Sequence, residues 1–255
     1  MNLLAIYNEF KSRVAFWLLL IWILAFIVQF RTLNYLLYPL FAVGLMTVLD
    51  LGITWIRSRK LYWPSASFVT GALIGLIIDP RAPVWIIAVA VSAAFVSKQF
   101  INRGIRQHIF NPAAFGIMTV SVVFGIPIAW WSVAWGKLPL VILVPAMIWV
   151  LWRMKRVLLP VGFIAIYFFY YLTIFDPKTA LMSLLDGSLL LFALVMLPEP
   201  ITSPIVGKFK YFFGASVALV SIAISKFGLG EVFLPALLIA NLGVFLVRQS
   251  SSSKL

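Results

Sequence analysis

Cysteine is absent from the 255 residues of this protein, and histidine occurs once, at position 108. Without cysteine the chain cannot form disulfides, and it cannot hold zinc or an iron–sulfur cluster through thiolates of its own. A single histidine is too few for a haem site or a multi-histidine metal site within one chain. We therefore expect no metal site made by this chain alone.

Charged residues are also scarce. They make up 11% of the chain, whereas 64% of the residues are hydrophobic. Soluble domains have about 25% charged and 45–50% apolar residues, so membrane lipid is the predicted solvent and partner for much of this surface. The net charge of +13 comes from small basic clusters between apolar runs. This distribution is typical of orientation signals in membrane proteins, so we expect no binding of nucleic acid.

Breaks at charged residues, proline and glycine leave ten apolar runs, at residues 14–30, 33–56, 66–78, 83–100, 112–128, 138–152, 157–175, 180–197, 211–226 and 231–247. Most have the 17–25 residues that a helix needs to cross about 30 Å of hydrocarbon, and the third and sixth are short. No small-residue cleavage site follows the first run, so we interpret it as an uncleaved span. The predicted fold is an all-α polytopic membrane protein with about ten transmembrane helices.

The basic residues give an independent test of this count. If the N-terminus is inside and the runs alternate, fifteen of the twenty Lys and Arg residues fall in inside segments. The five outside segments hold one each: Arg31, Arg81, Lys137, Lys178 and Lys226. The positive-inside rule therefore predicts a cell (inner, cytoplasmic) membrane protein with both termini in the cytoplasm.

The two halves of the chain resemble each other. Residues 70–83 resemble residues 186–204, and residues 110–113 resemble residues 233–236, at offsets of 116 and 123 residues. We predict two five-span repeats, at 1–130 and 131–255. Because five is odd, the repeats would be inverted, as in proteins that carry a substrate, ion or electron through a site where repeats meet. A duplication kept only as a scaffold is the alternative.

Asp50 lies within the second run, seven residues before Arg57 or about 10 Å along a helix. A buried carboxylate at this depth is either an ion or proton site, or it pairs with a neighbouring Lys or Arg or with backbone donors. We interpret Lys98 as an anchor at the membrane interface and His108 as an interface residue rather than a ligand.

A second group of residues could line a pocket at the seam between the repeats. Glycine and small polar residues allow helices to break there and expose backbone donors to a ligand. The predicted lining residues are Gly71, Asn111, Asp186, Gly187, Ser188 and Thr202. The alternatives are that the glycines only permit close helix packing, and that Asn111 before Pro112 only caps a helix.

Five short segments, at 98–100, 109–116, 184–188, 200–204 and 236–241, occur in consistent order within residues 65–247. They resemble the RnfD/NqrB family of membrane proteins, which belong to the Rnf electron-transport complex and the sodium-translocating NADH:quinone reductase. The resemblance implies an FMN bound covalently to a threonine, in a longer segment after the fifth span and within a sequence pattern ending Ala-Thr. Here that connection is only residues 129–136, and the chain contains no Ala-Thr pair.

The resemblance implies a membrane subunit that passes electrons within an ion-pumping complex. Because the acceptor threonine is missing, we expect no covalent FMN, and instead a non-covalent flavin (FMN or riboflavin) or a quinone. Electrons would come from a separate flavin or iron–sulfur reductase subunit, soluble or membrane-associated. The alternatives are a transporter of a small solute such as a flavin, and a scaffold that only anchors a reductase.

Overall fold

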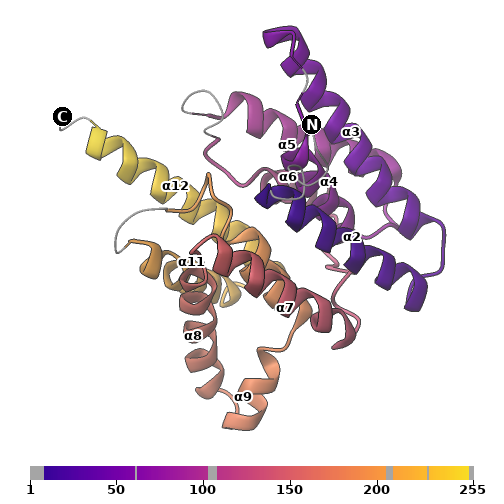
Figure 1. The fold of residues 1–255 in the computed structure, drawn as a ribbon. Coiled ribbons are helices and arrows are strands. Elements are labelled where there is room, and N and C mark those ends of the chain that lie inside the picture. Colours follow the sequence, from indigo (N-terminus) through magenta and orange to yellow (C-terminus); the bar gives the residue numbers. More distant parts are fainter. Residues whose placement is uncertain (1–8, 61, 103–107, 205–208, 229, 253–255) are drawn as a thin grey trace.

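The computed structural model describes residues 9–60, 62–102, 108–204, 209–228 and 230–252. Four basic residues counted above as inside lie outside this described part of the chain: Arg103, Arg106, Lys208 and Lys254. The described part is helical and contains no strand, so the all-α prediction is confirmed (Figure 1).

Each of the ten apolar runs contains helix. The first half comprises α2 (Phe10–Val28), α3 (Asn34–Ser58), α4 (Ser65–Ile77), α5 (Val84–Phe100) and α6 (Pro112–Phe124). The second half comprises α7 (Leu138–Arg153), α8 (Leu158–Leu172), α9 (Pro177–Ser183), α10 (Gly187–Leu191), the π-helix η1 (Phe192–Met196), α11 (Phe209–Ser225) and α12 (Phe233–Ser252).

Helix length divides these elements into two groups. Among the described residues, α2 and α3 are long and apolar enough to span a membrane, and α9 with α10–η1 forms a third such segment if the bent pair counts as one. The other apolar helices have 10–17 residues. A 13-residue helix such as α4 is only about 20 Å long, less than the hydrocarbon thickness. The count of ten crossings therefore stays a prediction.

The run expected as one span at 180–197 is broken. The axes of α9 and α10–η1 differ by 59°. The break follows from the sequence Asp186-Gly187, because the Asp186 carboxylate accepts a hydrogen bond from the Leu189 amide (2.8 Å) and starts a new helix at Gly187. The helix then continues as the π-helix η1, and π-helical turns are frequently found at functional sites.

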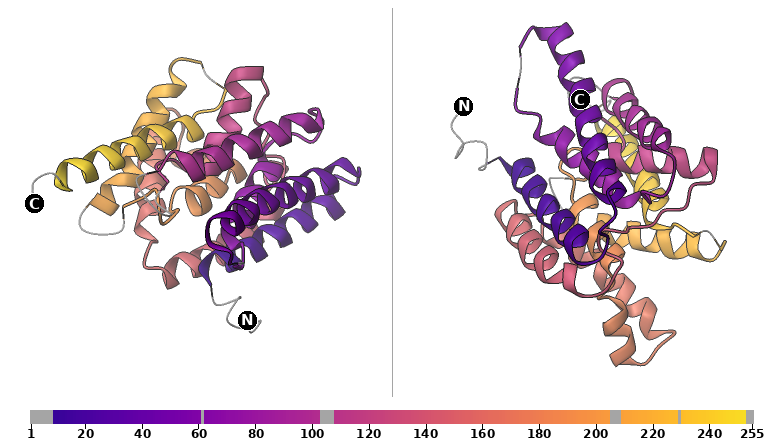
Figure 2. Two further views of the ribbon diagram at one scale, coloured as in Figure 1. Left: turned by 90° about the horizontal axis from the view of Figure 1, so that it is seen from above. Right: turned by 90° about the vertical axis from the view of Figure 1, so that its right-hand side faces the viewer.

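The two halves share one pattern of neighbours. In the first half, α2 and α3 pack on α4, α3 packs on α5, and α5 packs on α6. In the second half, α7 and α8 pack on α10–η1, α8 packs on α11, and α11 packs on α12. Across the seam, the first helices α2 and α7 meet, as do the last helices α6 and α12 (Figure 2). The repeats at 1–130 and 131–255 and their inverted orientation stay predictions, with which this packing is compatible.

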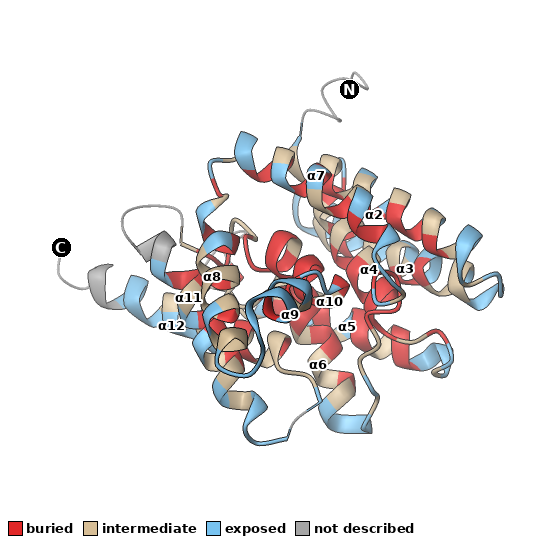
Figure 3. Cartoon of the chain, turned by 90° about the horizontal axis from the view of Figure 1, so that it is seen from below, coloured by how far each residue is buried: buried red, intermediate tan, exposed pale blue. Residues whose placement is uncertain are grey.

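The centre of the molecule is made by helices from both halves. Buried residues concentrate where α4, α5, α6 and α10 meet, while exposed residues lie on the outer helices (Figure 3). At one end of this centre, the connection between the halves closes the seam. The amides of Ala129 and Trp130 both donate to the carbonyl of Ile77 (3.1 Å each), and the Trp131 indole donates to the carbonyl of Gly75 (2.9 Å). The candidate site lies at the other end.

Candidate functional site

Asp50 forms the centre of a buried polar cluster within the first half. Its carboxylate on α3 accepts hydrogen bonds from the Ser67 hydroxyl of α4 (2.5 Å), and from Lys98 (2.8 Å) and Gln99 (2.7 Å) of α5. The hydroxyl of Tyr62 donates to the same carboxylate. We call Asp50 and these four donors the Asp50 cluster.

This arrangement bears on the two interpretations of Asp50. Its side chain is fully buried, and a lysine ammonium occupies the position that a bound cation would take. The pairing interpretation therefore accounts for every contact around it. Lys98 is correspondingly not a surface anchor, because only 14% of its side chain is exposed.

The second carboxylate of interest, Glu199, belongs to the loop of residues 198–203 that follows η1. Two arginines of the second half hold this loop by its carbonyl groups. Arg156, which is buried, donates to the carbonyl of Pro198 (3.2 Å) and to the hydroxyl of Ser203 (2.7 Å). Arg248 on α12 donates to the carbonyls of Ile201 and Ser203 (3.2 Å each).

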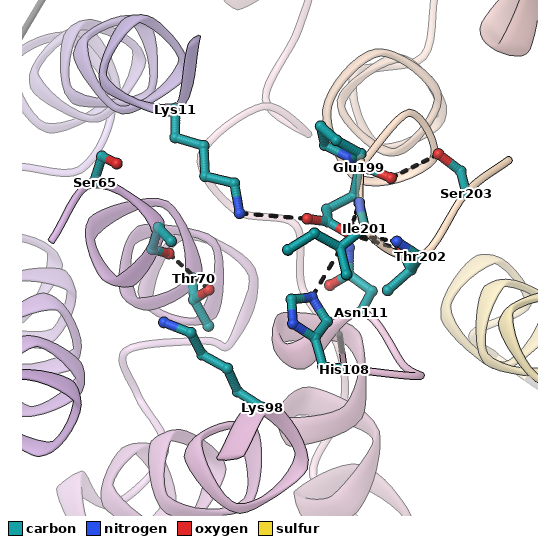
Figure 4. A network of polar contacts seen from close by, with 12 residues as sticks. Lys11, Ser65, Thr70, Lys98, His108, Asn111, Glu199, Ile201, Thr202 and Ser203 are labelled. Atoms are coloured by element: carbon teal, nitrogen blue, oxygen red, sulfur yellow. Dashed lines mark hydrogen bonds and ion pairs between the residues drawn. The ribbon is translucent and has the colours of Figure 1, made fainter. Parts of the chain in front are cut away.

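Held in this way, Glu199 links the loop to the first half. One carboxylate oxygen lies 3.4 Å from Lys11 Nζ at the start of α2. The other accepts from the Thr202 amide and hydroxyl (2.9 Å each) and lies 3.7 Å from His108 Nε2, an ion-pair distance rather than a hydrogen bond (Figure 4). Lys11, His108, Glu199 and Thr202 are called the Glu199 cluster below.

The charges around Glu199 outweigh its burial. Burial alone would raise the pKa of Glu199, but contacts with His108, Lys11 and Thr202 hold this pKa well below its usual range. Glu199 is therefore an anion at neutral pH. Burial lowers the pKa of Arg156, but an arginine remains charged.

A cleft opens between the two clusters. Its first-half walls come from the start of α2, one face of α4, Lys98 and the start of α6, and its second-half wall from the end of η1 and the loop that follows. Apolar side chains form most of the lining, notably Phe10, Val14, Val69, Leu73 and Val195. His108 contributes Nε2, a buried ring nitrogen with no hydrogen-bond partner among the described residues. Lys11 points toward Glu199 on the same side (Figure 4). The stem of Lys98 lines the cleft, but its ammonium binds Asp50. The cleft therefore combines apolar walls with a few polar groups.

Two of the predicted pocket residues lie at this cleft or beside it. Asn111 lines it. The Asn111 side-chain oxygen accepts from the Ala114 amide (3.1 Å) and so caps α6, and the Asn111 backbone amide donates to the side-chain oxygen of Asn241 (2.9 Å). Thr202 belongs to the Glu199 cluster and lines a second hollow that shares His108. The helix cap expected at Asn111 is present, and Asn241 ties it to α12.

The two predicted glycines lie against backbone instead. A Cβ on Gly71 would lie 2.6 Å from the Cα of Val43 on α3, and a Cβ on Gly187 would lie 2.1 Å from the carbonyl oxygen of Val133. These are the close approaches that only glycine permits. In both places the close-packing interpretation accounts for the glycine.

Asp186 and Ser188 are remote from the cleft. They lie at the start of α10, and the whole of α10 and η1 separates them from the Glu199 loop. There the Ser188 hydroxyl donates to the Asp186 carboxylate. Asp186 is exposed and serves as the helix cap described above. The structure therefore brings Asn111 and Thr202 together and leaves the Asp186–Ser188 segment at the opposite end of the seam.

Sequence reasoning missed Lys11 and Glu199 and did not foresee that His108 is buried. His108 is only 5% exposed, so it is a buried residue of the seam, and its depth in the membrane stays a prediction. One available signal was the scarcity of carboxylates. The chain has only seven carboxylates, and a glutamate at the end of an apolar run needs a cationic partner. In the structure that partner is Lys11.

Comparison with known proteins places the first half in a family. The model of the NQR2, RnfD, RnfE family matches residues 9–137. One relative, a subunit of the ion-translocating oxidoreductase complex of Actinobacillus succinogenes, is 24% identical over 129 residues, which is 49% of this chain and 36% of that protein. The relative of the same name from Buchnera aphidicola is 29% identical over 138 residues, 52% of this chain and 40% of that protein.

The matched stretch thus spans well under half the length of these relatives. It contains α2 to α6 and every first-half residue of the cleft, including Lys11, Lys98, His108 and Asn111. Because the family match covers just over half of the sequence, this chain belongs to the NQR2, RnfD, RnfE family.

Proposed function

We propose that this protein is a membrane subunit of a redox-driven, ion-translocating electron-transport complex, with the cleft at the seam as the site of a non-covalent flavin or quinone. The observation that carries the proposal is the overlap between family match and cleft. Relatives over residues 9–137 are named as subunits of an ion-translocating oxidoreductase complex, and that stretch supplies the larger part of the cleft wall.

The lining has the chemistry that such a ring needs. A flavin or quinone ring buries its flat faces against apolar side chains and presents carbonyl oxygens as acceptors. Val14, Leu73 and Val195 would contact the faces, while His108 Nε2 and Lys11 Nζ would donate to a carbonyl. When bound, the group would supply the redox chemistry, and the protein would position it, exclude water and hold Glu199 as a fixed negative charge beside it.

A covalent flavin is not part of this proposal. The connection between α6 and α7 runs from Gly125 to Lys137, and it contains no threonine. Protein separated by denaturing electrophoresis should therefore show no flavin fluorescence, even when a flavin-attaching enzyme is coexpressed. A fluorescent band that a threonine-to-valine change removes would contradict this expectation.

The optical spectrum and mass spectrum of protein purified gently from native membranes test the site. We expect flavin or quinone to copurify, and the change Leu73→Trp, which places a bulky ring in the cleft, to displace it while the protein still inserts in the membrane. Gly44→Ala, a change on α3 whose added Cβ meets nothing, is the control. Colourless protein that contains neither group would overturn the redox proposal and favour the transporter of a small solute.

We also propose that the complex lies in the cytoplasmic membrane and that a separate reductase subunit delivers electrons at the end that carries the Glu199 cluster. The chain allows a topological test because it has no natural cysteine. Ser58→Cys at the end of α3 should resist an impermeant thiol reagent in intact cells, and Lys178→Cys in α9 should react. Labelling of Ser58→Cys from outside would overturn the assignment of sides.

A further inference from the structure

The second hollow, which lies beside the cleft, differs from it in chemistry. Residues of the 198–203 loop and of α12 form most of its wall. Its polar groups come from His108, Thr202, Asn241 and Arg248, whereas apolar side chains form most of the cleft. Its volume is about 70 Å³. A water molecule takes about 30 Å³ in the liquid and is held by polar partners, so this hollow suits about two water molecules.

The second hollow also reaches the surface of the protein. Arg248, which lines it, is exposed, and Val244 and Phe245 on the same helix are half-buried. By contrast, each described residue that lines the cleft is buried or half-buried. Water therefore approaches the seam more readily through the second hollow than through the cleft.

His108 lies between these two spaces. Of the residues that the structure describes, it alone lines both the cleft and the second hollow. Its side chain is 5% exposed, and within the same part of the chain its Nε2 has no hydrogen-bond partner. Leaving such a nitrogen buried and unpaired costs free energy, so Nε2 is suited to a partner that enters one of the two spaces.

Four charged groups face His108 from the elements around it. The Glu199 carboxylate lies 3.7 Å from Nε2 and can pair with the ring while the ring carries a proton (Figure 4). Lys11 and Lys98 line the cleft, and Arg248 lines the second hollow. The ammonium groups of both lysines are already bound to carboxylates. Histidine is the side chain that ordinarily gains and loses a proton near neutral pH, whereas lysine and arginine stay charged.

We propose that His108 relays protons from the second hollow to the cleft. The relay rests on the proposed function, because its acceptor is the flavin or quinone in the cleft. Two electrons come from the reductase, and the protons that balance them come one at a time from His108. At each transfer the Nε2–H bond breaks, and an O–H or N–H bond forms on the bound group. Water in the second hollow then returns a proton to the ring.

The single histidine makes the route measurable without any bound group. Deuterium replaces the hydrogen on Cε1 of an imidazole only where water reaches the ring, and mass spectrometry of the digested protein counts this exchange. Val244→Trp fills the second hollow and should slow the exchange several-fold at a fixed pH. Leu242→Trp, at an exposed position of the same helix outside the hollow, is the control. Leu73→Trp, in the cleft, should also leave the exchange rate unchanged.

Proton uptake by protein purified with its bound group tests the relay itself. A flash-excited ruthenium complex injects electrons, and a pH-indicator dye in unbuffered solution records the protons taken up. His108→Gln keeps an N–H donor but cannot pass its proton on, so uptake should become about a hundredfold slower while the amount of bound group stays the same. Val244→Trp should slow uptake as well, and Leu242→Trp should not.

The outcomes separate the relay from the proposed function. Protein that contains neither flavin nor quinone would overturn both. Protein that contains the group, with proton uptake in His108→Gln as fast as in the parent, would overturn the relay alone. Equal deuterium exchange in Val244→Trp and Leu242→Trp would show that water reaches His108 by another route, and would also overturn it. If His108→Gln loses the group, Val244→Trp decides, because uptake at the parent rate in that variant contradicts the relay.

Discussion

The Asp50 cluster and the Glu199 cluster place a buried carboxylate at the same end of the molecule in different ways. Asp50, on α3, takes its partners from α4, α5 and the connection before α4, all within the first half. Glu199 takes Lys11 and His108 from the first half, while Arg156 and Arg248 of the second half hold its loop. The first cluster stabilises one half, and the second joins the two halves.

The difference shows which carboxylate is available for function. Four donors saturate the Asp50 carboxylate, and one of them is a nearly buried ammonium. Glu199 lines the cleft and faces His108 across an ion-pair distance of 3.7 Å, longer than a hydrogen bond. A seam contact of this kind can lengthen or shorten without unfolding either half, so the Glu199 cluster is the one expected to respond to a ligand.

The largest effect should follow from breaking the Asp50 cluster. Lys98→Met removes the cation and leaves a fully buried carboxylate without its charge partner, which should lower the free energy of unfolding by about 3 kcal/mol. Denaturation in micelles measures this value. The double change Asp50→Asn with Lys98→Met should recover part of the loss, and a single change that costs less than about 1 kcal/mol would contradict the assigned pairing.

Disrupting the contact between α3 and α4, which positions Ser67 beside Asp50, should give the next largest loss of stability. Gly71→Ala adds a Cβ 2.6 Å from the Val43 backbone, so α4 has to move away from α3 at a cost of about 2 kcal/mol. Gly44→Ala is the matched control on α3, because nothing lies within 4 Å of its added Cβ. The control should gain several tenths of a kcal/mol from helix propensity. Equal effects of the two changes would show that α3 and α4 are not in close contact.

Breaking the Glu199 cluster should lower the free energy of unfolding by a smaller amount and should loosen mainly the contacts across the seam. Glu199→Gln keeps an acceptor for Thr202 but removes the charge that pairs with Lys11 and His108, for a loss of about 1.5 kcal/mol. Hydrogen exchange should quicken in the 198–203 loop and at the start of α2, and remain unchanged in α3 and α5. Faster exchange throughout the first half would mean that Glu199 supports a whole half rather than the seam.

Local features of this fold could be predicted from the sequence, whereas contacts between distant residues could not. Apolar runs locate all ten helical segments because each run is a local property, and Asn111-Pro112 predicts its helix cap for the same reason. The functional role of a glycine depends on which backbone lies opposite, so Gly71 and Gly187 look like ligand positions in sequence and are contact positions in the structure. Glu199 and Lys11 are 188 residues apart, and only the fold brings them together.

The smallest effect concerns the pH dependence of the stability that Glu199 contributes. Because the folded-state pKa of Glu199 is lowered, its stabilising contribution is present above the ordinary glutamate pKa of about 4.3 and is lost as the pH falls toward the lowered value. Glu231, whose carboxylate accepts a hydrogen bond from the Trp130 indole (2.8 Å) at the opposite end of the seam, provides the control.

Between pH 5 and pH 4, below the range in which histidine ordinarily titrates, the parent protein should lose about 0.5 kcal/mol through Glu199. Glu199→Gln should lack this loss, while Glu231→Gln should keep it. The measurement is the difference in unfolding free energy between parent and variant at each pH, in which the other titrating carboxylates cancel. An unchanged pH slope in Glu199→Gln would mean that the contacts with Lys11 and His108 do not hold the carboxylate in its charged form, and the Glu199 cluster would then join the halves by its hydrogen bonds alone.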